Sequence, residues 1–92
     1  MLKIKDNVDL QELEKFGFKI IPEGIYAKSV DCYLDGMGDR HEKFIAIEKD
    51  RTINKYYVLS YLFKVYEEKR LHLWKKDIKD LITAGLVEKV DN

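Results

Sequence analysis

The chain has 92 residues, a length that allows a single domain spanning residues 1–92 with one modest hydrophobic core. Hydrophobic residues make up 46% of it and aromatic residues 12%, which excludes a disordered tail, because such segments are too poor in apolar residues to fold. Its 17 basic and 17 acidic residues cancel. The chain as a whole therefore has no electrostatic attraction to nucleic acid or to an anionic membrane, and only a local basic patch could supply one.

The expected location follows from the cysteine content and from hydropathy. The single cysteine, Cys32, excludes an intramolecular disulfide and fits a reducing compartment. The opening "MLKIKDNVDL" is charged and lacks the apolar region of a signal peptide. No stretch approaches the roughly 20 apolar residues that cross a bilayer. We expect a cytoplasmic protein without a membrane segment.

The first predicted element is a short helix. Asp9 is a favourable N-cap, and Glu12 three residues later completes a capping-box pattern. Gly17 is placed to end the helix in a left-handed conformation. Phe18 then opens a strand that "PEG" at 22–24 turns. The stripe that faces the core consists of Leu10, Leu13 and Phe16.

The middle of the chain is predicted to form strands. "GIYAKSVDCYL" at 24–34 is rich in β-forming residues. "DGMGDRHE" at 35–42 is polar and rich in glycine, which predicts a loop. "KFIAIEKDRTINKYYV" at 43–58 predicts a hairpin with its turn near "EKDR" at 48–51.

Residues 59–74, "LSYLFKVYEEKRLHLW", fit two structures. Leu59, Leu62, Phe63 and Tyr66 have helical spacing, whereas apolar residues also alternate on both sides of "EEKR" at 67–70. The matched alternation favours a hairpin with its turn at "EEKR", and the helix stays the alternative.

The C-terminal segment repeats the N-terminal arrangement of a helix, a glycine and a strand. Ile78, Leu81 and Ala84 form the apolar stripe, and Gly85 is the expected left-handed cap. A winged helix is disfavoured, because its wing needs a hairpin and "LVEKVDN" at 86–92 is long enough for one strand only. The predicted fold class is α+β, a small antiparallel sheet with a short N-terminal and a short C-terminal helix packed on it.

Metal, cofactor and catalytic sites are not predicted. Zinc needs three or four ligands of the Cys and His type, and the chain has one Cys and two His. Pairs of Cys32 with His41 or His72 could supply a nucleophile, but a buried strand cysteine is the commoner case. We therefore expect no enzymatic activity. Potential metal ligands gather only around the loop: Asp31, Cys32, Asp35, Asp39, His41 and Glu42.

Tyrosines and the loop predict a protein-binding surface. Tyrosine is enriched at protein contacts. Tyr56 and Tyr57 are adjacent in a predicted strand, so their side chains should lie on opposite faces. The partner would be another protein or a second copy of the chain. The predicted contact residues are Tyr33, Asp39, Arg40, His41, Tyr56 and Tyr57.

A basic patch supports the alternative function, nucleic-acid binding. Lysine and arginine can neutralise phosphates, and an aromatic ring can stack on a base. The predicted contact residues are Lys69, Arg70, Trp74, Lys75, Lys76 and Lys79.

Both ends of the chain carry a resemblance. "IKDNVDLQELEKFGFKI" at 4–20 and "DLITAGLVEKV" at 80–90 resemble the termini of a group of small phage and prophage proteins of Gram-positive bacteria. The resemblance implies a small cytoplasmic protein encoded by a phage-like element. It also implies binding to a host or antiviral-defence protein, or a role in regulating phage genes. It supplies no activity and no functional residues.

Overall fold

Two antiparallel sheets and three short helices build residues 1–90, the part of the chain that the computed structural model describes. The strands are β1 (Leu2–Ile4), β2 (Lys19–Ile20), β3 (Tyr26–Leu34), β4 (Arg40–Ile47), β5 (Ile53–Tyr61), β6 (Lys64–Leu71) and β7 (Val87–Lys89). The 3-10 helices are η1 (Leu10–Phe16) and η2 (Lys75–Ile78), and α1 (Lys79–Thr83) is the α-helix. The protein is thus mostly β, with the predicted N-terminal helix present as a 3-10 helix.

The five-stranded sheet is a meander in which each strand pairs with its neighbours in the sequence, in the order β2-β3-β4-β5-β6. β1 and β7 form a separate pair, and a bridge between Lys3 and Thr52 joins this pair to the start of β5. We call the face that carries Ile45, Ile47 and Ile53 the inner face, because these side chains are buried in the core. The opposite face is the outer face.

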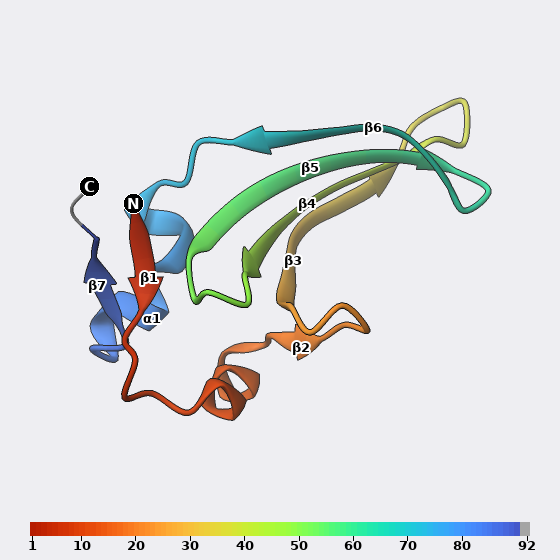
Figure 1. Ribbon diagram of the computed structural model, residues 1–92. Coiled ribbons are helices and arrows are strands. Elements are labelled where there is room, and N and C mark those ends of the chain that lie inside the picture. Colours follow the sequence, from red (N-terminus) through yellow and green to blue (C-terminus); the bar gives the residue numbers. More distant parts are fainter. Residues whose placement is uncertain (91–92) are drawn as a thin grey trace.

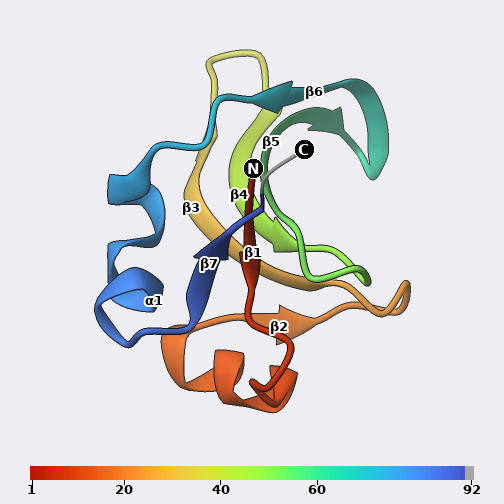
Figure 2. The ribbon, with the colours of Figure 1, turned by 60° about the vertical axis from the view of Figure 1, so that its left-hand side comes forward.

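The core lies at one end of the long strands. In Figure 1 the helices and the β1–β7 pair gather near β2, while the tips of β3 to β6 project away from them. Figure 2 shows the β1–β7 pair lying across this end of the sheet. The molecule is 44 Å long and only 24 Å and 22 Å across. The residues of the core are Ile4, Leu13, Phe18, Tyr26, Ile45, Ile47, Ile53, Ile78 and Leu81.

The N-terminal helix has the predicted ends but not the full predicted cap. The Asp9 carboxylate accepts a hydrogen bond from the Gln11 N–H at 2.9 Å. Within residues 1–90 the Glu12 carboxylate makes no return bond, so the capping box is not formed. Gly17 has φ 91° and Phe18 donates its N–H to the Leu13 carbonyl at 3.2 Å, which confirms the left-handed cap.

The C-terminal segment confirms the same device. Gly85 has φ 76°, and Leu86 donates its N–H to the Leu81 carbonyl at 3.1 Å before β7 begins. Ile78 and Leu81 are buried as predicted, but Ala84 is exposed because α1 ends at Thr83. Residues 91–92 lie outside the described part of the chain.

Residues 59–74 contain the favoured hairpin, but its turn was predicted in the wrong place. β5 and β6 pair from Lys55–Leu71 to Tyr61–Lys64, so the turn is Leu62–Phe63 and "EEKR" lies inside β6. The predicted loop at 35–42 is also too long, since Arg40, His41 and Glu42 belong to β4. Both errors have one cause. Outside the core these strands are exposed or half-buried on both faces, so charged residues remain solvated within them.

The β4–β5 turn ties the N-terminal segment to the sheet. Arg51 has φ 74°, and its Nη1 donates to the carbonyls of Lys5 at 2.8 Å and Val8 at 2.7 Å. The Arg51 carbonyl accepts the Ile4 N–H at 2.9 Å. One side chain therefore fixes the path of the chain between β1 and η1.

Arg51→Ala should lower the free energy of unfolding by about 2 kcal/mol, because it removes two charge-assisted hydrogen bonds. Arg51→Gly should lower it by a similar amount, since the relieved left-handed backbone is offset by the flexibility of glycine when unfolded. Urea unfolding measures both changes. A loss below about 0.5 kcal/mol in the alanine variant would contradict the tethering role, since that is the range of ordinary surface substitutions.

Candidate functional site

The tips of the two long hairpins lie at the same end of the sheet. β4 and β5 pair Arg40 with Ser60, which brings the loop at 35–39 next to the turn Leu62–Phe63. Figure 1 shows both tips projecting beyond the core. We call this region, residues 30–41 and 58–66, the free end. Its exposed apolar side chains are Val30, Tyr33, Leu34, Met37, Tyr61, Leu62, Phe63, Val65 and Tyr66.

The turn of the β5–β6 hairpin has an unusual composition. Leu62 has φ 48° and Phe63 has φ 67°, and positive φ at both central residues is the requirement of a type I′ turn. Such turns favour Asn-Gly, because a bulky side chain at positive φ costs about 1–2 kcal/mol per residue. The Phe63 side chain is fully exposed and that of Leu62 is 76% exposed. Folding of the isolated chain therefore gains little from either side chain.

A polar network holds the neighbouring loop. The Asp35 carboxylate accepts the N–H groups of Met37 at 2.9 Å and Asp39 at 3.1 Å. Its second oxygen lies 2.8 Å from Nε2 of His41, and Nδ1 of His41 lies 2.8 Å from the Tyr57 hydroxyl. These bonds fix the backbone that presents Met37, which is 84% exposed.

The tautomer of His41 follows from the two groups that it contacts. An ionised Asp35 only accepts hydrogen bonds, so Nε2 of His41 carries a proton. In the neutral imidazole Nδ1 then accepts from the Tyr57 hydroxyl. The Tyr33 ring stacks on the imidazole at 4.6 Å with 5° between the planes. The loop is thus joined to β3, β4 and β5.

The pKa values describe a structural network. The hydrogen bond from His41, followed by that from the Met37 N–H, lowers the pKa of Asp35. Desolvation raises the pKa of Tyr57, and the negative charge of Glu67 adds to the rise. A tyrosine nucleophile needs a lowered pKa. The pKa of Tyr57 is shifted in the opposite direction. We therefore interpret the contacts among Asp35, His41 and Tyr57 as structural support for the loop.

Asp35 should make stability depend on pH in the acid range. Its folded pKa lies below the ordinary 3.8, so the folded state binds fewer protons than the unfolded state. The stabilisation is complete well above 3.8 and is lost as the pH falls through the folded pKa. Between about pH 5 and pH 3, wild type should lose more unfolding free energy than Asp35→Asn. Equal losses in urea titrations would contradict this role. Asp50, whose pKa is also lowered, is retained in both proteins.

The predicted protein-binding residues divide between the two faces. Cross-strand partners share a face, and this puts Tyr33, His41 and Tyr57 together on the inner face. Tyr56 lies on the outer face, where its hydroxyl donates to Glu48 at 3.1 Å, so the predicted opposition of Tyr56 and Tyr57 is confirmed. The remaining two predicted residues lie apart from the inner-face trio. Asp39 is half-buried in the loop, and Arg40 on the outer face donates from Nε to Cys32 Sγ at 3.2 Å.

The six predicted nucleic-acid-binding residues do not all lie on one surface. Lys69 lies on the inner face with Nζ 3.9 Å from the Glu67 carboxylate and 5.1 Å from the centre of the Tyr57 ring. Arg70 points to the outer face, because it pairs with Tyr56. Lys79 is exposed on α1. The other three residues, Trp74, Lys75 and Lys76, line one hollow near β1.

Sequence reasoning missed the apolar half of the free end. Large apolar side chains are usually buried, so Leu34, Leu62 and Phe63 were not predicted at a binding surface. Met37 lies in the predicted contact loop but was not named as a contact residue. The signal that could have found the turn was the absence of any Gly, Pro, Asn or Asp between 59 and 74. A hairpin in that segment has to turn on residues that are unfavourable in turns.

Metal-binding groups come together only in part. Asp35 contacts His41, but Cys32 lies on the outer face and His41 on the inner face, so Cys32 and His41 do not pair. Among residues 1–90 no group of three or more His, Cys, Asp or Glu side chains could hold a metal ion. In the same part of the chain, no helix combines the length and the apolar character needed to cross a membrane.

Comparison of the chain with protein-family models, with curated proteins and with solved structures finds no match. No residue role is therefore transferred from another protein. Function is therefore inferred from the geometry of the free end and of the hollow near β1.

Proposed function

We propose that this chain is a non-enzymatic binding protein that contacts a protein partner with the free end of its sheet. The observation that carries the proposal is the Leu62–Phe63 turn, in which two bulky apolar residues occupy left-handed conformations and are exposed. Backbone strain that the fold does not require is typical of functional positions.

Binding would recover the free energy that folding leaves unused. Burying a Leu, Phe or Met side chain contributes about 1.5–3 kcal/mol. Leu62, Phe63 and Met37 lie on adjoining tips, and the Asp35 network holds the loop in place before the partner arrives. Such preorganisation lowers the entropy that binding costs.

The shape of the free end favours a protein as partner. Small ligands bind in concave sites, whereas two projecting hairpin tips fit into a groove on another macromolecule. Lys64 follows the Leu62–Phe63 turn and Asp39 ends the neighbouring loop, so the tips carry charges of both signs, as the polar rim of a protein interface does. Mixed signs give no attraction to a polyanion or an anionic membrane.

The class of partner comes from the resemblance of the two termini to phage and prophage proteins. A host or antiviral-defence protein is the partner that this origin implies. A second copy of the chain is the alternative, and the experiment distinguishes the two.

The test is affinity capture from a Gram-positive bacterial lysate with three immobilised proteins: wild type, Leu62→Asn/Phe63→Gly, and Ile20→Asn. Ile20 is the matched control, since it is an exposed apolar residue at the core end. A protein retained by wild type and by Ile20→Asn, but lost with the turn variant, supports the proposal. Equal retention by all three, or by none, overturns it.

Light scattering of the same three proteins tests self-association. The proposal expects a monomer in each case. A dimer that the turn variant disrupts would replace the host partner with a second copy of this chain.

A further inference from the structure

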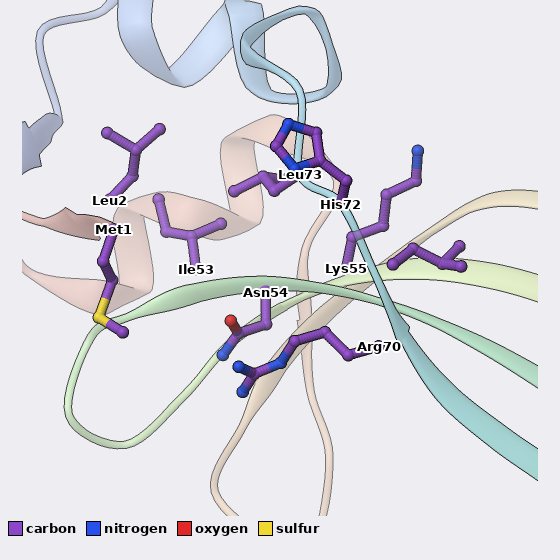
Figure 3. A pocket seen from close by; sticks show the side chains of 9 residues that line it. Met1, Leu2, Ile53, Asn54, Lys55, Arg70, His72 and Leu73 are labelled. Carbon is purple, nitrogen blue, oxygen red and sulfur yellow. The ribbon is translucent and has the colours of Figure 1, made fainter.

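Three adjoining hollows surround Met1 at the core end of the molecule, far along the sheet from the free end. The first, of about 690 Å³, lies between β1, η2 and β7. The second, of about 510 Å³, shares Met1, Leu2, His72 and Leu73 with the first (Figure 3). The third, of about 460 Å³, shares Met1, Asn54 and Arg70 with the second. The four shared residues join the first two hollows in one open groove, and the third hollow lies next to it.

The first hollow combines an aromatic ring with positive charge. Trp74 lines it and is 56% exposed, and the His72 ring lies edge-on to the indole at 4.1 Å. Lys75, Lys76 and Lys89 also line it, and among residues 1–90 no acidic residue does so. A ligand with a flat ring and a negative charge fits these surroundings.

The carboxylate of Asp77, the acidic residue of η2, already accepts hydrogen bonds within the protein. Asp77 accepts the Trp74 N–H at 2.8 Å and the Lys55 ammonium at 3.2 Å. These bonds fix the backbone at Trp74. Within residues 1–90, neither Lys75 nor Lys76 forms an ion pair, so both ammonium groups remain available.

The second hollow is also lined by basic and polar side chains. In Figure 3 the guanidinium of Arg70 lies beside the amide of Asn54, on the side of the hollow away from His72. Arg70 can bind a phosphate with two parallel hydrogen bonds, and Asn54 can donate to or accept from a base edge. The third hollow differs, because the carboxylates of Glu48 and Asp50 line it together with Lys49.

We propose that this groove binds single-stranded nucleic acid. One base stacks on Trp74, and its phosphate lies against Lys75 and Lys76. The neighbouring nucleotide reaches Arg70 and Asn54. A stacking aromatic ring in a positively charged groove is the usual construction of sites that bind single strands without sequence preference. A single nucleotide would use only the first hollow, whereas the continuity of the groove favours a strand.

Trp74 provides the readout, because it is the only tryptophan of the chain. A dT12 oligonucleotide should quench its fluorescence, and log Kd should rise linearly with log salt concentration. In fluorescence anisotropy with labelled dT12, Trp74→Ala should weaken binding about tenfold or more, and Trp74→Phe should restore part of it.

Charge reversal supplies the matched control. Lys75→Glu/Lys76→Glu should weaken binding strongly and reduce the salt slope by about 1.4, the contribution of two phosphates of a single strand. Lys15→Glu/Lys19→Glu changes the net charge equally on exposed residues outside the groove and should leave most of the affinity. Urea midpoints of all variants confirm that they are folded.

Four results would overturn the proposal. They are no quenching at low salt, equal weakening by the two charge reversals, dTMP binding as tightly as dT12, and full competition by polyglutamate. The third result would assign the site to free nucleotides, and the fourth would assign it to an acidic peptide. Each is independent of the free end, since none of the substituted residues lies there.

Discussion

Leu62→Asn/Phe63→Gly should make the isolated protein more stable than wild type, by about 1–2 kcal/mol in urea unfolding. The variant places Asn-Gly where both central residues have positive φ, which is the preferred sequence of a type I′ turn. Two strained residues at about 1–2 kcal/mol each are relieved, and the greater flexibility of glycine in the unfolded chain offsets part of the gain. A substitution that stabilises the fold and removes binding identifies a residue retained for function.

Gly38→Ala is the opposite substitution at the adjoining tip, since it adds a side chain where the backbone has positive φ. Gly38 has φ 85°, and an added Cβ would meet only the Tyr61 ring, at an ordinary contact distance of 3.5 Å. Space is therefore available, and the backbone alone should lower the free energy of unfolding by about 1 kcal/mol. If the Leu62–Phe63 replacement instead destabilises the protein, the two side chains support the fold and the functional interpretation of the turn is wrong.

Phe18→Ala should cost about 3–5 kcal/mol of unfolding free energy, the largest loss expected in this chain. Phe18 is buried at the end of η1, where its N–H closes the cap and its ring packs into the core. Lys28 lies over the ring with Nζ 5.7 Å from its centre. Removing the ring leaves a cavity between η1 and the sheet. The loss is large, because the total free energy of unfolding of a domain of this size is only about 5–15 kcal/mol.

Phe63→Ala is the matched control for that loss, because it makes the same substitution on a fully exposed ring. Its effect on unfolding free energy should stay within about 0.5 kcal/mol. Urea midpoints of the two variants compare the two ends of the molecule directly. Similar losses at Phe18 and Phe63 would mean that the free end contributes to folding as the core does.

The ends of the fold could be predicted from the sequence because their signals are local. A glycine after an apolar stripe specifies a left-handed cap at Gly17 and again at Gly85, and the next residue returns to the helix in both cases. The apolar run at 43–47 likewise predicted part of β4, because Ile45, Ala46 and Ile47 are buried. Local rules work here because local conformation and burial agree.

The free end and the strand segments that lead to it could not be predicted in the same way, because they depart from those rules. β6 carries Glu67, Glu68, Lys69 and Arg70 in succession, and only pairing with β5 makes this segment a strand. The turn has no turn-forming residue. His41 and Tyr57 were both named from the sequence, but their contact joins residues 16 positions apart and depends on the register of β4 and β5. Departures from local consistency are expected at functional sites.

The most direct test of the central claim, that the free end is the binding surface, is site-specific photo-crosslinking in Gram-positive bacterial cells. Benzoylphenylalanine replaces Phe63 in one protein and Ile20 in another, both at exposed apolar positions. We predict one adduct of defined mass from position 63 and none from position 20. No adduct from position 63, or the same adducts from both positions, would contradict the claim.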